Sequence, residues 1–154
     1  MALTVNRDVD HYVDQELRSF AVAASSHIYK GAFVGVSASG YVRPLTAGDR
    51  LAGIAYEESD NSAGADAAKF VRVYTVGDFG HALSGATVAD VGRPVFASGD
   101  DTLTYTADGN TYVGVTQNVP AAGSIVLRLD PSRRQVKTLV HGVEDLSAGA
   151  DVAT

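Results

Sequence analysis

The sequence predicts an all-β protein, either a β-sandwich or a small β-barrel. Short runs of apolar, β-branched and aromatic residues follow one another about every 8–12 residues between positions 21 and 129. The segments between these runs are rich in Gly, Ser and Asp, which are typical of tight turns. The 154 residues include 16 glycines, and 45% of them are hydrophobic while only 19% are charged. This composition indicates a globular protein and excludes a disordered one.

The clearest single unit is a hairpin predicted over residues 90–105. Residues 95–97 (Val-Phe-Ala) form an apolar run, and residues 98–101 (Ser-Gly-Asp-Asp) supply a polar turn. Residues 102–106 then return to β-branched and aromatic side chains. Pro94 has no N–H, so the first strand should begin there or lie at a sheet edge.

The same pattern of apolar runs separated by polar turns predicts strands along most of the chain. They are residues 21–24, 32–36, 41–43, 51–56, 70–76, 79–83, 95–97, 103–106, 112–116 and 124–129. Residues 57–68 are small and polar, which predicts a loop. The β pattern is absent at both ends. We therefore divide the chain into an N-terminal arm (1–20), a β domain (21–131) and a C-terminal tail (132–154), the last expected to fray.

The N-terminal arm has apolar residues at steps of three and four with acidic residues between them. These six candidate partner-binding residues are Val5, Val9, Tyr12, Val13, Leu17 and Phe20. Their spacing is typical of one face of an amphipathic helix. The alternative is an extended arm that becomes ordered against a partner. Such a stripe should be buried, and we expect an intermolecular contact.

An internal repeat is suggested by two short matches at one offset. Gly31 and Gly92 are 61 positions apart, and so are Gly53 and Gly114. Each copy would consist of two strands and a third strand with a central glycine. A glycine in that position marks a bulge or the close approach of another backbone.

The sequence contains no catalytic constellation and no cofactor-binding motif. The four histidines are far apart, there is no cysteine, and no phosphate-binding loop or dinucleotide motif occurs. Residues 35–39 (Gly-Val-Ser-Ala-Ser) nearly match a nucleophile elbow, but they lack its second glycine and the helix that should follow. We therefore expect no enzyme activity, no metal and no cofactor.

Charge and hydropathy limit the partners. The net charge is −6, whereas a protein that neutralises nucleic-acid phosphates needs a basic face. No apolar run approaches the roughly 20 residues that span a bilayer, and no secretory signal is visible. We expect a soluble protein that is made in a cytoplasm and binds neither nucleic acid nor membrane.

One extended set of residues carries a family resemblance. The matching stretches are 47–49, 53–55 (Gly-Ile-Ala), 76–79 (Val-Gly-Asp-Phe), 84–97, 100–104, 112–115 (Tyr-Val-Gly-Val) and 126–129 (Val-Leu-Arg-Leu). The resemblance is carried by the span Asp49 to Leu129 with the two residues before it, and its most specific part is the run from Ser84 to Thr104. This span resembles the capsid cement (head decoration) proteins of tailed phages.

The resemblance implies a compact β-barrel or β-tulip domain that assembles as a homotrimer. Such a protein would sit on the outer surface of the virion capsid at three-fold positions and clamp neighbouring major capsid subunits against the pressure of the packaged DNA. Its partners would be the major capsid protein and itself. An acidic protein suits the outer surface, away from DNA. Residues 1–20 and 132–154 extend beyond the family pattern.

Two other non-enzymatic functions fit the same fold. The first is another phage structural module, in a tail or baseplate. The second is a glycan-binding β-sandwich used for attachment, which needs aromatic platforms. The candidates for such platforms are Tyr41, Tyr56, Tyr74, Tyr105 and Tyr112.

Overall fold

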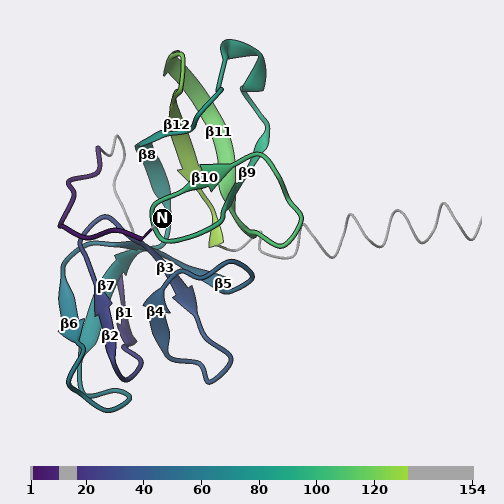
Figure 1. The fold of residues 1–154 in the computed structure, drawn as a ribbon. Helices are drawn as coiled ribbons and strands as arrows, with labels where there is room; N and C mark the ends of the chain where they lie inside the picture. Colours follow the sequence, from purple (N-terminus) through teal and green to yellow (C-terminus); the bar gives the residue numbers. More distant parts are fainter. Residues whose placement is uncertain (1, 11–16, 132–154) are drawn as a thin grey trace, which may run out of the picture.

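The computed structural model describes residues 2–10 and 17–131, and there the protein is all-β (Figure 1). Two antiparallel sheets of five strands each and one two-stranded sheet form the described part. The fold-class prediction is therefore confirmed at the level of a sandwich or barrel-like β protein, without a closed barrel.

The first five-stranded sheet lies in residues 17–76, which we call the first half. Its strands, in spatial order, are β1 (Leu17–Ala21), β7 (Phe70–Tyr74), β5 (Arg50–Ala55), β3 (Phe33–Val36) and β4 (Val42–Pro44). The two-stranded sheet, made of β2 (Ser26–Ile28) and β6 (Ser59–Asn61), also lies in this half.

The second five-stranded sheet lies in residues 77–131, which we call the second half. Its strands, in spatial order, are β8 (Gly77–Ala82), β12 (Ser124–Leu129), β11 (Thr111–Ala121), β9 (Pro94–Ala97) and β10 (Leu103–Thr104). A short 3₁₀ helix, η1 (Val88–Asp90), precedes β9. In Figure 1 the first half lies below and the second half above.

The two halves are copies of one sheet. Strand for strand, β1 corresponds to β8, β7 to β12, β5 to β11, β3 to β9 and β4 to β10, and every pairing is antiparallel in both. The registers also match. The β3–β5 pair opposes Val34 with Gly53, and 61 positions later the β9–β11 pair opposes Val95 with Gly114. The internal repeat predicted from the glycines is therefore a structural repeat.

Hydrogen bonds outside the regular ladders repeat at the same offset. The amide of Gly31 donates to the carbonyl oxygen of Ala55 at 2.9 Å. Sixty-one residues later, the amide of Gly92 donates to that of Thr116 at 2.8 Å. The duplication therefore extends to the turns that lead into β3 and β9.

The mid-strand glycines have the same unusual conformation in both copies. Gly53 and Gly114 each have φ of +155°, and the register slips by one residue beside each of them. A Cβ on Gly53 would lie 3.0 Å from the carbonyl carbon of Tyr74 and closer still to its oxygen. A Cβ on Gly114 would meet Arg128 in the same way, 2.9 Å from the carbonyl carbon. Both positions therefore require glycine, as expected for a bulge crossed closely by a neighbouring strand.

The halves differ by an insertion. Val73 and Leu127 occupy equivalent positions, since they pair with the equivalent residues Ala55 and Thr116, yet they are only 54 apart in sequence. The first half thus has seven more residues between these paired positions of β5 and β7 than the second half has between those of β11 and β12. That extra chain includes β6, which pairs with β2. The predicted loop over residues 57–68 therefore contains a strand that the sequence pattern missed.

The core joins the two halves. One cluster of buried side chains contains Phe33, Leu45, Leu51 and Ile54 from the first half with Phe79, Val95, Val113, Ile125, Leu127 and Leu129, among others, from the second. A second cluster belongs to the first half alone and includes Val22, Ile28, Val34, Val71 and Val73. We call the interface between the two halves the seam. Across it the ring centroids of Phe33 and His81, and those of Tyr74 and Phe79, lie 5.3 Å apart. Burial of apolar side chains along the seam thus holds the repeats together.

The N-terminal prediction needs a correction. Of the two interpretations of the arm, the amphipathic helix is wrong in the described residues, because Leu17–Ala21 forms strand β1 and residues 2–10 are extended without a helical turn. Pairing of β1 with β7 supplies a partner strand that local spacing does not reveal. The domain boundary proposed after residue 20 falls inside β1, and the tail (132–154) lies outside the described residues.

Candidate functional site

Residues 2–10, which we call the N-terminal segment, lie across the seam and bond to both halves (Figure 1). The amide of Arg7 donates to the carbonyl oxygen of Lys30 in the first half at 3.0 Å. On the second half, the amide of Leu3 donates to the carboxylate of Asp100 at 3.1 Å. The amide of Gly80 donates to the carbonyl oxygen of Asp10 at 3.0 Å, which adds a bond at the open edge of β8. The N-terminal segment therefore joins one half to the other, and we also call it the strap.

The side chain of Arg7 is the centre of this strap. Its guanidinium forms an ion pair with Asp101, in the β9–β10 turn. It also donates to the carbonyl oxygen of Gly31 at 3.2 Å and lies 3.0 Å from Nε2 of His81. One cation thus contacts a carboxylate, a carbonyl and an imidazole from both sides of the seam.

The lack of a side chain at Gly31 leaves room for the N-terminal segment to pass over it. Its φ is +85°, and a Cβ there would lie 2.9 Å from a methyl group of Val9 and closer still to the carbonyl oxygen of Arg7. The equivalent Gly92 has φ of +88° but no atom within 4 Å of a Cβ. The two glycines share a turn conformation, and only Gly31 is also covered by the N-terminal segment.

Two buried groups that contact the N-terminal segment have shifted pKa values. Burial lowers the pKa of His81, and the Arg7 cation lowers it further, while the Ala82 carbonyl and Asp101 act in the opposite direction. Burial raises the pKa of the Asp100 carboxyl against the hydrogen bond from Leu3. The N-terminal segment therefore contacts two ionisable groups, His81 and Asp100, whose pKa values depend on the folded structure.

The structure divides the six predicted partner-binding residues among different environments. Val5 is 67% exposed and Leu17 40% exposed, whereas Val9 packs against the shared core and Phe20 against the first-half core. Tyr12 and Val13 lie outside the described residues. The residues therefore do not form one apolar stripe in the described part, and their binding of a partner stays a prediction.

A second candidate surface, which sequence reasoning missed, is the turn around η1. Val88 is 74% exposed and Val91 49% exposed there. The turn is fixed by Asp90, whose carboxylate accepts from the amide of Thr87 at 2.8 Å and from Arg93 at 2.7 Å. Arg93 also lies over the ring of Tyr105, 4.1 Å from its centroid. The sequence signal that could have revealed this turn is the T-x-x-D pattern at residues 87–90, which is typical of a capped helix start.

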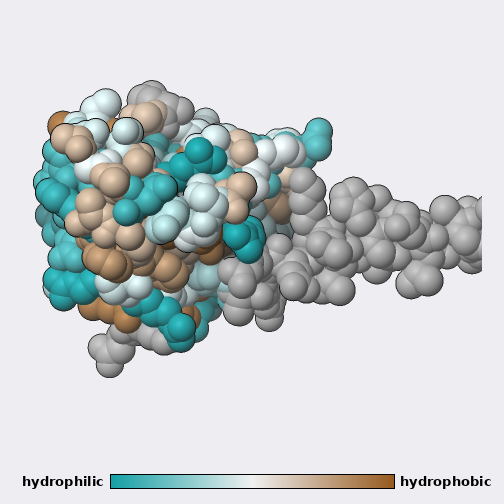
Figure 2. Space-filling model, turned by 90° about the horizontal axis from the view of Figure 1, so that it is seen from below, coloured by the Kyte–Doolittle hydropathy of each residue, from teal (hydrophilic) through white to brown (hydrophobic). Residues whose placement is uncertain are grey.

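The η1 turn lies at the end of the second half that is remote from the first half, at the top of Figure 1. Figure 2 views the opposite end, where apolar areas lie among hydrophilic ones. Phe70, 60% exposed on β7, is the exposed aromatic residue of the first half. The η1 turn differs from this surface because its two apolar side chains project from a short, braced turn.

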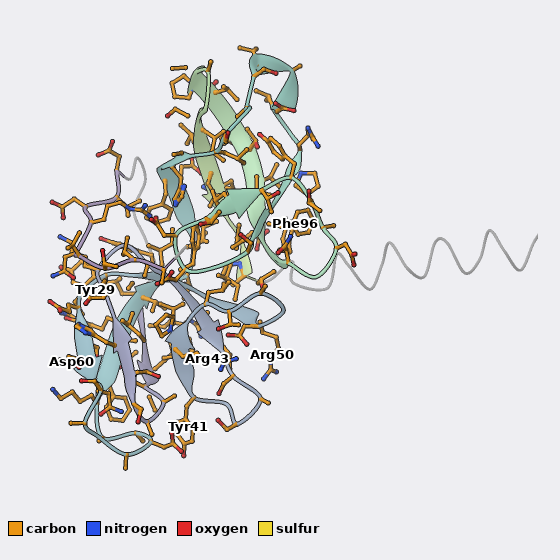
Figure 3. All side chains as sticks on the ribbon, in the orientation of Figure 1. Tyr29, Tyr41, Arg43, Arg50, Asp60 and Phe96 are labelled. Carbon is orange, nitrogen blue, oxygen red and sulfur yellow. The ribbon has the colours of Figure 1, made fainter. Side chains whose placement is uncertain are left out.

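The aromatic residues do not form one platform. Tyr112 is only 5% exposed and packs edge-on against Phe96 in the second half at 5.8 Å. Tyr41 lies at the far end of the first half (Figure 3). Tyr56 and Tyr74 contact each other at 5.4 Å with Arg72 over Tyr56. The set predicted for glycan binding is therefore dispersed over the two halves.

Residues 2–10 and 17–131 contain no group of three or more His, Cys, Asp or Glu side chains placed to hold a metal ion. Within the same residues, no helix is long and apolar enough to cross a membrane. The Gly99–Asp101 turn, predicted as a hairpin turn, does join β9 and β10. Its aspartates serve the N-terminal segment, as described above.

Comparison with known proteins assigns no family: no family model, no curated protein and no solved structure matches the chain.

Proposed function

We propose that this protein is a non-enzymatic structural component of a phage virion that binds the outer surface of the capsid. It would stabilise the shell by clamping neighbouring major capsid subunits, and it would act as a homotrimer. The proposal rests first on the family resemblance of the span Asp49 to Leu129. It does not depend on any catalytic group.

The observation that carries the proposal is the conformation of the most specific part of that span. Residues 84–104 form a continuous part of the second half, from the η1 turn through the β9–β10 hairpin. Their apolar side chains divide into two sets. Val95 and Ala97 are buried in the core, whereas Val88 and Val91 face solvent. A core role therefore accounts for the first pair and leaves the second pair available for a partner.

The η1 turn is suited to docking because it is already ordered. Asp90 bonds both to Thr87 and to Arg93, and Gly92 donates to Thr116 on β11. A rigid turn loses little conformational entropy when it binds, so more of the contact energy appears as affinity. Exposed valines on such a turn would fit an apolar recess on the capsid surface.

The test is a capsid-binding assay with variants that place aspartate on the η1 turn or at a distant exposed position. We expect Val88→Asp with Val91→Asp to weaken binding to purified capsids at least tenfold, about 1.4 kcal/mol. Ala63→Asp, at an exposed position of the first-half insertion, should bind as the wild type does. Three copies together should be seen by light scattering of the free wild type or in maps of virions that carry it.

Purified virions should also contain the protein in a fixed ratio to the major capsid protein. Its presence only in tails would support the tail or baseplate module instead. Binding to a glycan array without binding to capsids would support the attachment module. Either result, or normal capsid binding by the double valine variant, would contradict the proposed docking by η1.

A further inference from the structure

The His81 side chain is only 4% exposed, and its two ring nitrogens have different partners. Nδ1 lies 2.7 Å from the carbonyl oxygen of Ala82, which can only accept, so Nδ1 carries the hydrogen. Nε2 lies 3.0 Å from Nη2 of Arg7, which can only donate. The ring must therefore be neutral, with Nε2 accepting from Arg7.

Among residues 2–10 and 17–131, few groups near His81 can compensate a second positive charge. The N-terminal segment contributes the Arg7 cation, and the β9–β10 turn contributes Asp101, with Oδ1 3.8 Å from Nε2. From the other elements, β3 contributes the Phe33 ring and β12 the apolar cross-strand neighbour Ile125. Asp101 is already paired with Arg7.

The remaining charges around β8 and the turn have other partners. Asp78, also on β8, falls on the opposite face by strand alternation and pairs with Arg128 at 3.0 Å. Asp100 accepts from the amide of Leu3. Asp101 is thus the carboxylate for which a protonated His81 and Arg7 would compete.

We propose that the N-terminal segment is a pH-sensitive strap, in which protonation of His81 breaks the contact with Arg7 and releases residues 2–10 from the seam. A proton on Nε2 removes the acceptor that Arg7 uses and places an N–H opposite a guanidinium. Like charges at this distance repel strongly when one of them is buried. The imidazolium can then turn to Asp101, which leaves Arg7 without its ion pair.

Release should be local, because the rest of the seam does not depend on the strap. The Phe33 amide donates to the carbonyl oxygen of Asp100 at 2.8 Å, and Thr111 links to Gly48 and Asp49 across the same boundary. The shared apolar core also remains. This inference stands on the His81 geometry and does not require the proposed capsid role.

The direction of the pH effect follows from the pKa shift. Because the pKa of His81 is lowered in the folded protein, the strap should be closed above the ordinary histidine value of about 6.5 and open as the pH falls through the lowered value. The stabilisation that depends on Asp100 changes with pH in the opposite direction. The pKa of Asp100 is raised, so its contribution is present below about 3.9 and is lost as the pH rises.

The experiment is an NMR titration of the full chain from about pH 8 to about pH 4, which spans the histidine range. The His81 ring reports its protonation, and the exchange protection of the Gly80 and Arg7 amides reports the strap. We expect their protection factors to fall at least tenfold with the His81 midpoint, while amides of β11 and β12 keep theirs.

Variants separate this mechanism from others. His81→Gln should abolish the pH dependence of strap protection. His27→Gln changes a partly exposed histidine that reaches the N-terminal segment only through Glu58, which also accepts from Asn6, and it should leave the transition at the His81 midpoint. Asp100→Asn should also retain the transition. If His81→Gln does not fold, Arg7→Gln provides a second test, since loss of the cation should raise the His81 midpoint.

Three results would overturn the inference. The strap amides could stay protected below the His81 midpoint, or could lose protection only together with β11 and β12. The transition could also persist unchanged in His81→Gln.

Discussion

Alanine at Gly53 or Gly114 should destabilise the protein far more than alanine at other glycines with positive φ. At φ of +155° an alanine adopts a region that only glycine populates readily, at a cost of about 1–3 kcal/mol. Its Cβ would also lie within 3.0 Å of a carbonyl carbon of the neighbouring strand, so the two strands must separate. Loss of one or two ladder hydrogen bonds adds about 0.5–1.5 kcal/mol each. We expect a total of about 3 kcal/mol for either variant.

The matched controls are Gly85→Ala and Gly109→Ala. These glycines have φ of +81° and +72°, and nothing lies within 4 Å of a Cβ at either. Their cost is that of the left-handed conformation alone, about 1–2 kcal/mol. Comparison with them isolates the effect of the close strand approach.

Urea unfolding followed by circular dichroism measures the free energies, and calorimetry measures the midpoints. A loss of about 3 kcal/mol should lower Tm by roughly 6–12 °C in a chain of this size. The repeat further predicts that the Gly53 and Gly114 variants behave alike within about 1 kcal/mol, because their contacts are equivalent. Variants no less stable than the controls would refute the close-approach argument, and very unequal losses would refute the equivalence.

Two further predictions concern the strap and the η1 turn. Gly31→Ala should be more destabilising than Gly92→Ala in urea unfolding, because the two share a φ near +85° but only Gly31 lies under the N-terminal segment; equal losses would show that the segment yields freely. The ion pair with Arg93 holds the pKa of Asp90 below its ordinary value. The Asp90 carboxylate therefore stabilises the fold above about pH 3.9, and this stabilisation is lost as the pH falls through the lowered pKa. Urea midpoints should therefore show Arg93→Gln less stable than the wild type at neutral pH, with the gap closing in acid; a gap that does not change with pH would contradict this sign.

The strands and the repeat could be read from the sequence because their causes are local. A short run of apolar and β-branched residues that follows a turn signal predicted a strand at residues 124–129, and these coincide with β12. Glycine spacing identified Gly53 and Gly114, because a glycine in a strand usually serves the backbone rather than the core. These signals need no knowledge of which strands are neighbours.

The tertiary structure decided what local pattern could not. Residues Leu17–Phe20 fit helical spacing, yet pairing with β7 makes them part of a strand. Ser59–Asn61 has the composition of a loop, but it is a strand because β2 lies beside it and Asn61 donates to the carbonyl oxygens of Ala23 and Ala65. Here a partner supplied the hydrogen bonds that outweighed intrinsic preference.

The strap is the plainest case of a feature that only folding creates. Arg7 meets Asp101 across 94 positions of sequence and His81 across 74. Each of these residues alone looks like an ordinary surface charge or a turn residue. Their joint chemistry exists because the duplicated halves pack together and leave a seam for the N-terminal segment to cross, and no spacing rule along the chain encodes that packing.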